Sequence, residues 1–587
     1  MKKLFLIPLA ALALASCSSD VPGLDQAPFD ADENGNVYIS FGLANSTGIL
    51  SRADDVADAT FENGEAAENE VKKVRIFFFN ETGAPANVKK IGTPSTSVNY
   101  YDYVPTSVAE QKPDGQNVAY IVDATIVLNI NDMDDKNYPT HMMAVINPVD
   151  EGTTVLGSGK TLSELQKEVG TYMNSNGFIM SNSIFINSAS KIAPQAEITG
   201  HIYATDDAAK ADPVVMYVER TAAKVRLSIG DLTPVTNVKD PADETKTLAN
   251  VFDTQEKYGD KKVYVQFLGW NVTTTADKSY LYKNYDESWS NQYIGWTANV
   301  TDFHRSFWAK NPSGITLGYT SFNEVNATNA TLPLANAIKA FDNTGDNKNF
   351  TYLRENAGDP TTGLDPEARK RSQVIIAAQL IGEDGKPLEF AEYALVKYSL
   401  TDINKVIYSS LGTKIYKAGT DGGRVEIDPA TDIVFKTSTA LGKNKADGTG
   451  TYYVYAQLAN TSGYFKSLDA TDSTDATTEL NASLINTGGP VKIWKSGYAY
   501  YYIDIEHLNN GETPLKGTAN NVYGQYGVVR NHVYNISINS LLGLGTPVYD
   551  PKEEIIPEKP GPDYGAIAAK INILAWRIVE QGADLEW

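Results

Sequence analysis

The chain has 587 residues and a formal net charge of −22, from 72 acidic and 50 basic residues. Nucleic-acid binding needs basic patches that neutralise phosphates, and binding to anionic lipid needs clusters of lysine and arginine, so this composition argues against both. The only cysteine is Cys17, which excludes a disulfide within the chain. Stability must therefore come from hydrophobic cores, and a chain of this length has room for several.

The first residues have the pattern of a lipoprotein signal peptide. Met1–Lys3 is basic, and Leu4–Leu14 is an apolar run too short to span a bilayer. The following Leu14–Cys17 resembles the bacterial lipobox, in which the cysteine receives a diacylglycerol. Two or more acyl chains, such as palmitate, are enough for a stable anchor. The alternative is an ordinary secretory signal in which Cys17 has no role.

An acidic leader follows the signal and contains one predicted strand. Val37, Ile39, Phe41 and Leu43 alternate with smaller or polar residues, which is the period of a half-buried strand. Residues 30–35 imitate the opening of a calcium loop, but position twelve is Phe41 where a bidentate glutamate is required. We interpret them as a turn that leads into the strand.

One basic residue, Arg52, stands between Lys3 and Lys72. It lies in a small, polar segment followed by Ala53 and Asp54. Such exposed segments are where proteolytic nicking concentrates, so Arg52 suits an arginine-specific protease. An ordinary surface charge is the simpler interpretation of the residue by itself, and both readings stay open at this point.

The body of the chain is rich in strand-like runs separated by polar loops with glycine, asparagine and aspartate, which is typical of β-sandwiches. Thr161–Met173 is the best helical candidate because its apolar residues recur at spacings of three and four. Val214–Leu227 is predicted as one long strand, with a domain boundary at its start. The other predicted strands are Lys73–Phe79, Ala119–Leu128, Met142–Ile146, Lys262–Leu268, Val374–Leu380, Tyr452–Leu458, Tyr498–Ile505 and His532–Ile538.

The last section changes character. Gly545–Pro562 carries five prolines among charged residues, and we expect an extended linker that does not join a core. Ala569–Val579 is strongly β-prone and apolar on both faces, with Ile571 and Ile573 on one face and Leu574, Trp576 and Ile578 on the other; Val579 ends it. Such a strand is an aggregation hazard when bare, so it needs a partner groove.

No pattern in the sequence indicates catalysis or a bound cofactor or metal. The five histidines are scattered, and no nucleophile elbow, phosphate-binding loop or dinucleotide fingerprint is present. Carboxylates are abundant, and none is singled out as an acid–base pair. Tyr498–Tyr502 has the composition of a glycan-binding platform, but alternate tyrosines in a strand are more typical of the core and rim of a sheet.

Several segments, which follow one another in the same order along the whole chain, resemble the type V pilins of Bacteroidales, and most closely the major subunit of the minor (short) fimbriae. One difference is Ala575, where relatives are expected to have proline. The segments that carry the resemblance are Val71–Asn80, His141–Pro148, Gly177–Ser181, Tyr217–Val225, Gly269–Asn271, Arg305–Ala309, Tyr352–Asn356, Val529–Tyr534, Gly543–Pro547 and Ile571–Glu580.

The resemblance implies a mainly β protein that polymerises. Two β-sandwich (transthyretin-like) domains with long loops are implied, with a cleaved leader strand and an extended C-terminal donor strand. The implied path is export as an outer-membrane lipoprotein, cleavage after Arg52 by an arginine-specific, gingipain-like protease, and filling of the emptied groove by the donor strand of another subunit. This favours the proteolytic reading of Arg52. Head-to-tail exchange of this kind gives a filament, since it does not close into a ring.

Mapped onto the chain, the resemblance gives five segments and a set of partners. The partners are other copies of the chain, anchor and tip subunits of the fimbrium, the protease and, for adhesion and biofilm formation, host or bacterial surface ligands. A tip adhesin, a glycan-binding or glycan-degrading surface lipoprotein and a lipid-retaining anchor subunit are the alternatives. The segments are a signal peptide (1–17), a propeptide with the plug strand (18–52), an N-terminal domain with the acceptor groove (53–213), a C-terminal domain (214–545) and a linker with the donor strand (546–587).

Overall fold

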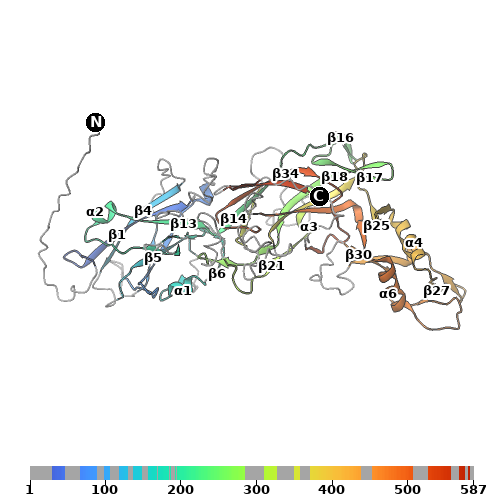
Figure 1. Ribbon diagram of the computed structural model, residues 1–587, viewed down its shortest axis with the longest axis horizontal. Coiled ribbons are helices and arrows are strands. Elements are labelled where there is room, and N and C mark those ends of the chain that lie inside the picture. The colour runs from blue at the N-terminus through green and yellow to red at the C-terminus, as the bar shows by residue number, and fades with distance from the viewer. Residues whose placement is uncertain are drawn as a thin grey trace, which may run out of the picture.

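The computed structural model shows an elongated, mainly β molecule (Figure 1). Strands form at Val37–Leu43 and at the eight runs predicted from Lys73–Phe79 to His532–Ile538, and the mainly β fold class is confirmed. The residues that the structure describes are 29–46, 66–88, 98–105, 118–129, 137–148, 156–167, 169–183, 185–186, 192–193, 195–284, 310–326, 350–356, 371–437, 453–506, 526–556, 567–574 and 579–581.

The first sheet has eight strands, in the order β3-β2-β5-β9-β13-β1-β4, with β12 paired to β5 off this path. One of its faces covers a core of aliphatic and aromatic side chains, among them Ile76, Phe78 and Met142, all fully buried. The strands are β1 (Asn36–Ser46), β2 (Val74–Phe79), β3 (Tyr100–Tyr103), β4 (Val118–Asn129), β5 (His141–Ile146), β9 (Met180–Asn182), β12 (Ala196–Glu197) and β13 (Val214–Arg220).

The single strand predicted over residues 214–227 is wrong in one respect, because two strands form there. β13 ends at Arg220 and pairs with β1 and β9, whereas β14 (Ala222–Ile229) pairs with β23 and β34 in another sheet. The chain therefore changes sheet at Thr221, whose backbone N–H donates to the Ile179 carbonyl at 3.0 Å. The domain boundary predicted at residue 214 coincides with the start of β13. β13 itself belongs to the first sheet, and the change of sheet comes after it.

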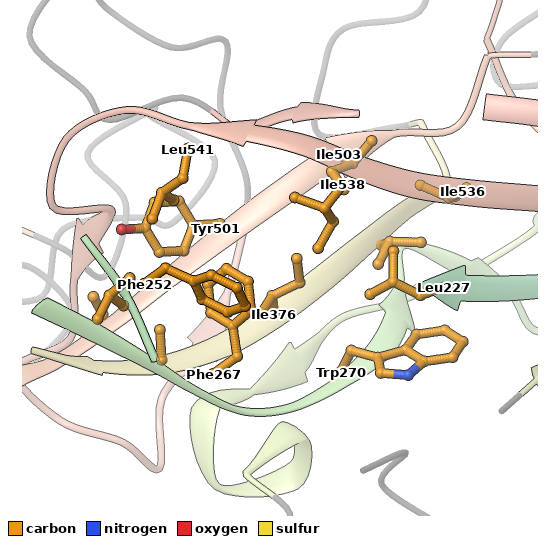
Figure 2. Packing of buried hydrophobic residues seen from close by; sticks show 14 of the residues in the cluster. Leu227, Phe252, Phe267, Trp270, Ile376, Tyr501, Ile503, Ile536, Ile538 and Leu541 are labelled. Carbon is orange, nitrogen blue, oxygen red and sulfur yellow. The ribbon is translucent and has the colours of Figure 1, made fainter. Parts of the chain in front are cut away.

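Two five-stranded sheets face each other across the next core, in the orders β23-β14-β34-β37-β38 and β17-β18-β24-β33-β35. Side chains from both sheets interdigitate there, with Trp270, Ile376 and Tyr501 from one sheet against Leu227 and Ile538 from the other (Figure 2). The strands are β17 (Val251–Tyr258), β18 (Lys261–Thr273), β23 (Phe350–Arg354), β24 (Gln373–Ile381), β33 (Tyr498–Asp504), β34 (Val533–Leu541), β35 (Thr546–Pro547), β37 (Ile567–Leu574) and β38 (Val579–Gln581).

The tyrosines of β33 belong to this sandwich and not to an exposed platform. Tyr501 is 2% exposed and lies in the core between the sheets, while Tyr500 is 1% exposed on the opposite face, packed with Phe322 and Val548. Burial on both faces leaves neither ring free to stack on a sugar. The prediction that these tyrosines form the core of a sheet is confirmed.

A third module lies between β24 and β33 and was not predicted. It has a core of its own, and Figure 1 shows it projecting from the far end of the molecule around α4, α6 and β27. Within it, Ser399 caps α4 by accepting from the backbone N–H of Asp402 at 3.1 Å. The elements are β25 (Phe390–Tyr393), β26 (Val396–Tyr398), α4 (Leu400–Ser410), β27 (Tyr416–Ala418), β28 (Arg424–Glu426), α5 (Pro429–Asp432), β29 (Ile433–Thr437), β30 (Tyr453–Leu458), β31 (Tyr464–Phe465), α6 (Thr477–Gly488) and β32 (Val491–Trp494).

The helix predicted over residues 161–173 is wrong beyond its first turn. α1 covers Leu162–Leu165 and begins with a capping box between Thr161 and Glu164. Further on, Val169 and Gly170 form β6, which pairs with Ser279 and Tyr280. The tertiary ladder overrides a helical spacing that was read from only four apolar positions.

The linker predicted over residues 545–562 is also wrong in its first part. β35 pairs with the edge of β33, and Ile555 pairs with Thr320 and is 1% exposed. Pro547 is compatible with this position because an edge strand has one side without ladder hydrogen bonds. The apolar residues between the prolines therefore dock the segment up to residue 556.

The remaining elements are short. No helix among the described residues is long and apolar enough to cross a membrane. These elements are η2 (Ala66–Glu68), β7 (Met173–Asn174), β8 (Gly177–Phe178), β10 (Phe185–Ile186), β11 (Ile192–Ala193), α2 (Asp206–Ala211), β15 (Lys239–Asp240), β16 (Asp243–Thr247), β19 (Thr275–Ala276), β20 (Ser279–Tyr280), β21 (Leu317–Gly318), β22 (Thr320–Ser321), α3 (Phe322–Val325), η10 (Lys495–Gly497) and β36 (Glu554–Ile555).

Candidate functional site

The predicted plug strand, β1, is an interior strand of the first sheet. It pairs in parallel with β13, from Phe41 opposite Val214 onward, and antiparallel with β4, from Asn36 opposite Asn129 onward. Its second half, Phe41–Asn45, is thereby paired on both edges, while its first half pairs with β4 and, at Tyr38, with Tyr203. Removing β1 would leave a slot between β13 and the edge strand β4, which is the geometry that a strand-accepting groove requires.

The turn before β1 fixes where the strand begins. The Asp32 carboxylate accepts from the backbone N–H groups of Asn34 at 2.9 Å and Asn36 at 2.7 Å, and Gly35 has a φ of +77°. A positive φ of this kind is natural for glycine and costly for other residues. This aspartate-based turn is what the sequence predicted in place of a calcium loop.

Three of the four predicted plug side chains lie in the core. Val37, Ile39 and Phe41 are all fully buried, and the Phe41 ring meets the ring of Tyr103 edge to face with centroids 6.1 Å apart. Full burial of a side chain of this size contributes about 1.5–3 kcal/mol. The backbone of Leu43 continues the ladder opposite Met216. The leader is thus a large contributor to the core of the first sheet.

The predicted donor residues lie in a different sheet from β1. In β37, Ile571, Ile573 and Leu574 stand opposite Ile536, Tyr534 and Val533 of β34, and Val579 of β38 pairs back onto Ile573. Trp576 and Ile578 lie outside the described residues, as do Cys17, Arg52 and Ala53. The structure therefore does not bring the plug and donor segments of one chain together.

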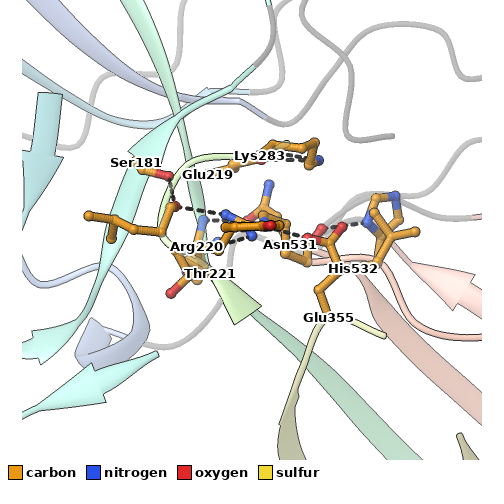
Figure 3. A network of polar contacts seen from close by, with 12 residues as sticks. Ser181, Glu219, Arg220, Thr221, Lys283, Glu355, Asn531 and His532 are labelled. Carbon is orange, nitrogen blue, oxygen red and sulfur yellow. Dashed lines mark hydrogen bonds and ion pairs between the residues drawn. The ribbon is translucent and has the colours of Figure 1, made fainter. Parts of the chain in front are cut away.

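A buried ionic network joins the first sheet to the sandwich (Figure 3). Its outer pair is Lys283 with Glu219, whose charged atoms lie 3.0 Å apart, and burial lowers the pKa of Lys283 while Glu219 and Glu355 oppose that shift. Glu355 in turn binds the Arg530 guanidinium at 2.8 Å. All four side chains are almost completely buried.

Arg220 links this network to the segment that follows the leader. Its guanidinium donates to the Glu68 carbonyl at 2.8 Å and to the Asn531 side chain at 3.1 Å, and it also contacts Asn69. Glu68 itself pairs with Lys224 at 2.6 Å, both side chains being buried. Glu68 and Asn69, near the start of the next described segment, are therefore held in the interior.

This network was missed from the sequence, although it left a signal. Glu219, Arg220 and Lys224 are charged residues inside a segment that reads as a buried strand, and a buried charge is rarely found without a partner. Removing one member of a buried pair costs about 3–5 kcal/mol because the other charge is left without compensation. The network makes the position of β13 relative to the sandwich specific.

Residues 492–582 match the family described as major fimbrial subunit protein type IV, fimbrillin, C-terminal. Over these residues the chain resembles the fimbrillins. The resemblance noted in the sequence is confirmed at this level. The matched region begins in β32, at the end of the third module, and includes β33, β34 and the C-terminal strands.

Three solved structures align with most of the chain at low sequence identity. A fimbrilin (FimA) from Porphyromonas gingivalis W83 aligns with a TM-score of 0.37 and 13% identity, covering 93% of this chain and 98% of its own. A putative cell adhesion protein from Parabacteroides distasonis has a TM-score of 0.34 and 11% identity, with coverages of 94% and 98%. The tip fimbrial protein Mfa3 from Porphyromonas gingivalis aligns with a TM-score of 0.29 and 8% identity, covering 91% of this chain and 99% of its own. No curated protein matches the sequence.

Proposed function

We propose that this fimbrillin-like chain is a structural, non-enzymatic shaft subunit of a cell-surface fimbrium that polymerises by strand exchange. The precursor is exported to the outer membrane with lipid on Cys17. An arginine-specific protease cuts after Arg52, the leader leaves with β1, and the C-terminal strand of another subunit fills the slot. The filament then supports adhesion and biofilm formation, and the mature subunit contains no cysteine.

The observation that carries the proposal is the place of β1 in the sheet. The strand belongs to the leader, it is paired on both edges over Phe41–Asn45, and three of its side chains are fully buried. A cut in residues 47–65 separates it covalently from the body, which remains fixed from Glu68 onward by the buried pair with Lys224. Cleavage therefore turns an ordinary interior strand into a replaceable one.

The donor must satisfy two conditions that the structure sets. It has to lie parallel to β13 and antiparallel to β4 to repeat the pairing of β1, and the ladder between β37 and β34 has to open. The docked segment ends at Ile556, and the backbone from there to Ile567 spans at most about 35–40 Å when fully extended. That length is sufficient to lie along a neighbouring subunit.

Sequencing the N-terminus of subunits from surface filaments tests the processing step. The expected first residue is Ala53; a lipidated Cys17 on polymerised material contradicts it. The Arg52→Ala variant should accumulate as lipidated precursor.

Deleting residues 567–587 tests donation of the C-terminal strand. We expect a folded monomer that does not polymerise, and Trp576→Asp should have the same effect with the backbone kept. Normal filaments from both variants would show that another segment fills the slot.

A second candidate is a tip adhesin, which the third module favours. This module has its own core and projects at one end of the molecule, where its Phe390 and Trp494 also pack into the sandwich core. Immunogold labelling of intact fimbriae separates the two roles, because a shaft subunit labels along the filament and a tip adhesin only at its end.

A further inference from the structure

We propose that the acceptor slot has one fixed wall and one wall that the leader itself holds in place, so that the slot closes when the leader leaves and no donor is present. This inference rests on the strand exchange proposed above and adds an order of events to it. The two walls are β13 and β4, which lie on either side of β1 in the first sheet.

β13 is the fixed wall. On the side away from β1 it pairs with β9 at Val218–Arg220, and β9 pairs on with β5 in the middle of the sheet. At its end, Arg220 is tied to Glu68 and Asn531 in the buried network. Loss of β1 leaves these interactions in place.

β4 is the dependent wall. Within the described residues, β1 is the only strand that pairs with β4, along a register from Asn36–Asn129 to Ser46–Val118. The side chain of Asn129 also bonds to leader residues, donating to the Asn34 carbonyl at 3.0 Å and to the Asn36 side chain at 2.9 Å. When the leader departs, β4 loses its whole described ladder, and its buried Ile126 and Leu128 lose the plug side chains beside them.

The strand directions allow the two walls to pair with each other. β1 is parallel to β13 and antiparallel to β4, so β13 and β4 are antiparallel to each other. With β1 between them they stand two strand spacings apart, about 9–10 Å, and direct pairing would bring them to about 5 Å. Closure satisfies the backbone groups that the leader exposed, and buried backbone groups are costly to leave unpaired.

A closed slot has no room for a donor strand. The backbone edges that the donor needs would be paired, and the pockets of Val37, Ile39 and Phe41 would be filled by collapse. Capture of the donor therefore has to accompany departure of the leader. A subunit that loses its leader alone becomes inactive for assembly, because only the open fraction binds a strand.

The test compares two orders of addition. The full-length chain carries Cys17→Ser, to prevent lipidation, and Trp576→Asp, to prevent self-donation. It is cut with an arginine-specific protease, and a synthetic peptide of residues 567–587 is supplied either during cleavage or several hours later; Arg52→Ala is the uncut control. Peptide capture is measured by size-exclusion chromatography with a fluorescent peptide.

We expect capture during cleavage and a fall of about tenfold or more after the delay, which corresponds to a closed state favoured by at least roughly 1.4 kcal/mol. Equal peptide capture in both orders would refute the proposal that the slot closes when the leader leaves, but would still support strand exchange. Capture in neither order, from a chain that has lost its leader, overturns strand exchange and this inference with it.

A cross-link reports closure directly. Ala124 and Val214 are both register partners of Phe41, one on each wall. In the Ala124→Cys/Val214→Cys variant, the plugged chain should resist oxidation because its cysteines lie beyond the roughly 7 Å Cα limit for a disulfide. The disulfide should form after cleavage without peptide and not with it. Equal cross-linking before and after cleavage would contradict closure.

Discussion

Phe41→Ala is the most direct perturbation of the plug. Phe41 is fully buried in the core of the first sheet, in contact with the ring of Tyr103. Truncating a buried phenylalanine to alanine costs about 3–5 kcal/mol, from lost burial and from the cavity left behind. At roughly 1.4 kcal/mol per factor of ten, the cut leader should dissociate about 100-fold to 4,000-fold faster than the wild-type leader.

The assay cuts the Cys17→Ser precursor after Arg52 and follows release of a fluorescently labelled leader. Glu33→Ala is the matched control, since Glu33 is in the same leader but exposed, and such a change should shift stability by no more than about 0.5 kcal/mol. Stability of the assembled mature subunit should be unchanged in both variants. Release of the Phe41→Ala leader at the wild-type rate would refute the idea that core packing retains the plug.

Three further changes test other parts of the structure. Glu68→Ala leaves its buried lysine partner uncompensated, and should lower the free energy of unfolding by about 3–5 kcal/mol in urea denaturation. Burial acts to raise the pKa of Asp102, but the hydrogen bonds and charge of Arg75, with help from a neighbouring lysine, bring it below 3.8. As the pH falls, the Asp102 carboxyl therefore binds its proton at a higher pH in the unfolded chain than in the folded one. The stabilisation that the charged Asp102 gives the fold is complete above pH 3.8 and is lost as the pH falls through the folded pKa. When the free energy of unfolding is measured against pH, Arg75→Met should show a smaller acid loss than the wild type. Gly545 has a φ of +70° and a Cβ there would lie 2.8 Å from the Tyr501 ring, so Gly545→Ala should destabilise the docked tail by more than about 1 kcal/mol and expose residues 546–556 to limited proteolysis.

The sequence predicted single strands well and their partners poorly. Alternation along Val37–Leu43 is a local signal, and β1 forms there. Its neighbours β13 and β4 are contributed by distant parts of the chain, and nothing in the local alternation specifies which strand pairs with which. The interior place of the plug therefore required the structure, although the resemblance had implied that the plug fills a groove.

The third module shows a helical signal that was overlooked. Leu400, Ile403 and Ile407 have helical spacing, and Ser399 with Asp402 forms the cap of α4. The loops around this segment are long and polar, and they mask its helical spacing. In the proline-rich segment, the proline content predicted an extended linker. Ile555 and its apolar neighbours nevertheless dock against the body.

The position of β1 also bears on the energetics of assembly. On the proposed mechanism, the three buried plug side chains contribute roughly 5–9 kcal/mol in the precursor, and cleavage alone leaves them in place. A donor that presents Leu574, Trp576 and Ile578, or Ile571 and Ile573, offers apolar surface of similar size. The free energy of burying the plug strand and that of burying the donor strand in the groove are then nearly equal. Hydrolysis of the leader peptide bond gives the reaction its direction, because the released leader can diffuse away while the donor remains tethered to its own subunit.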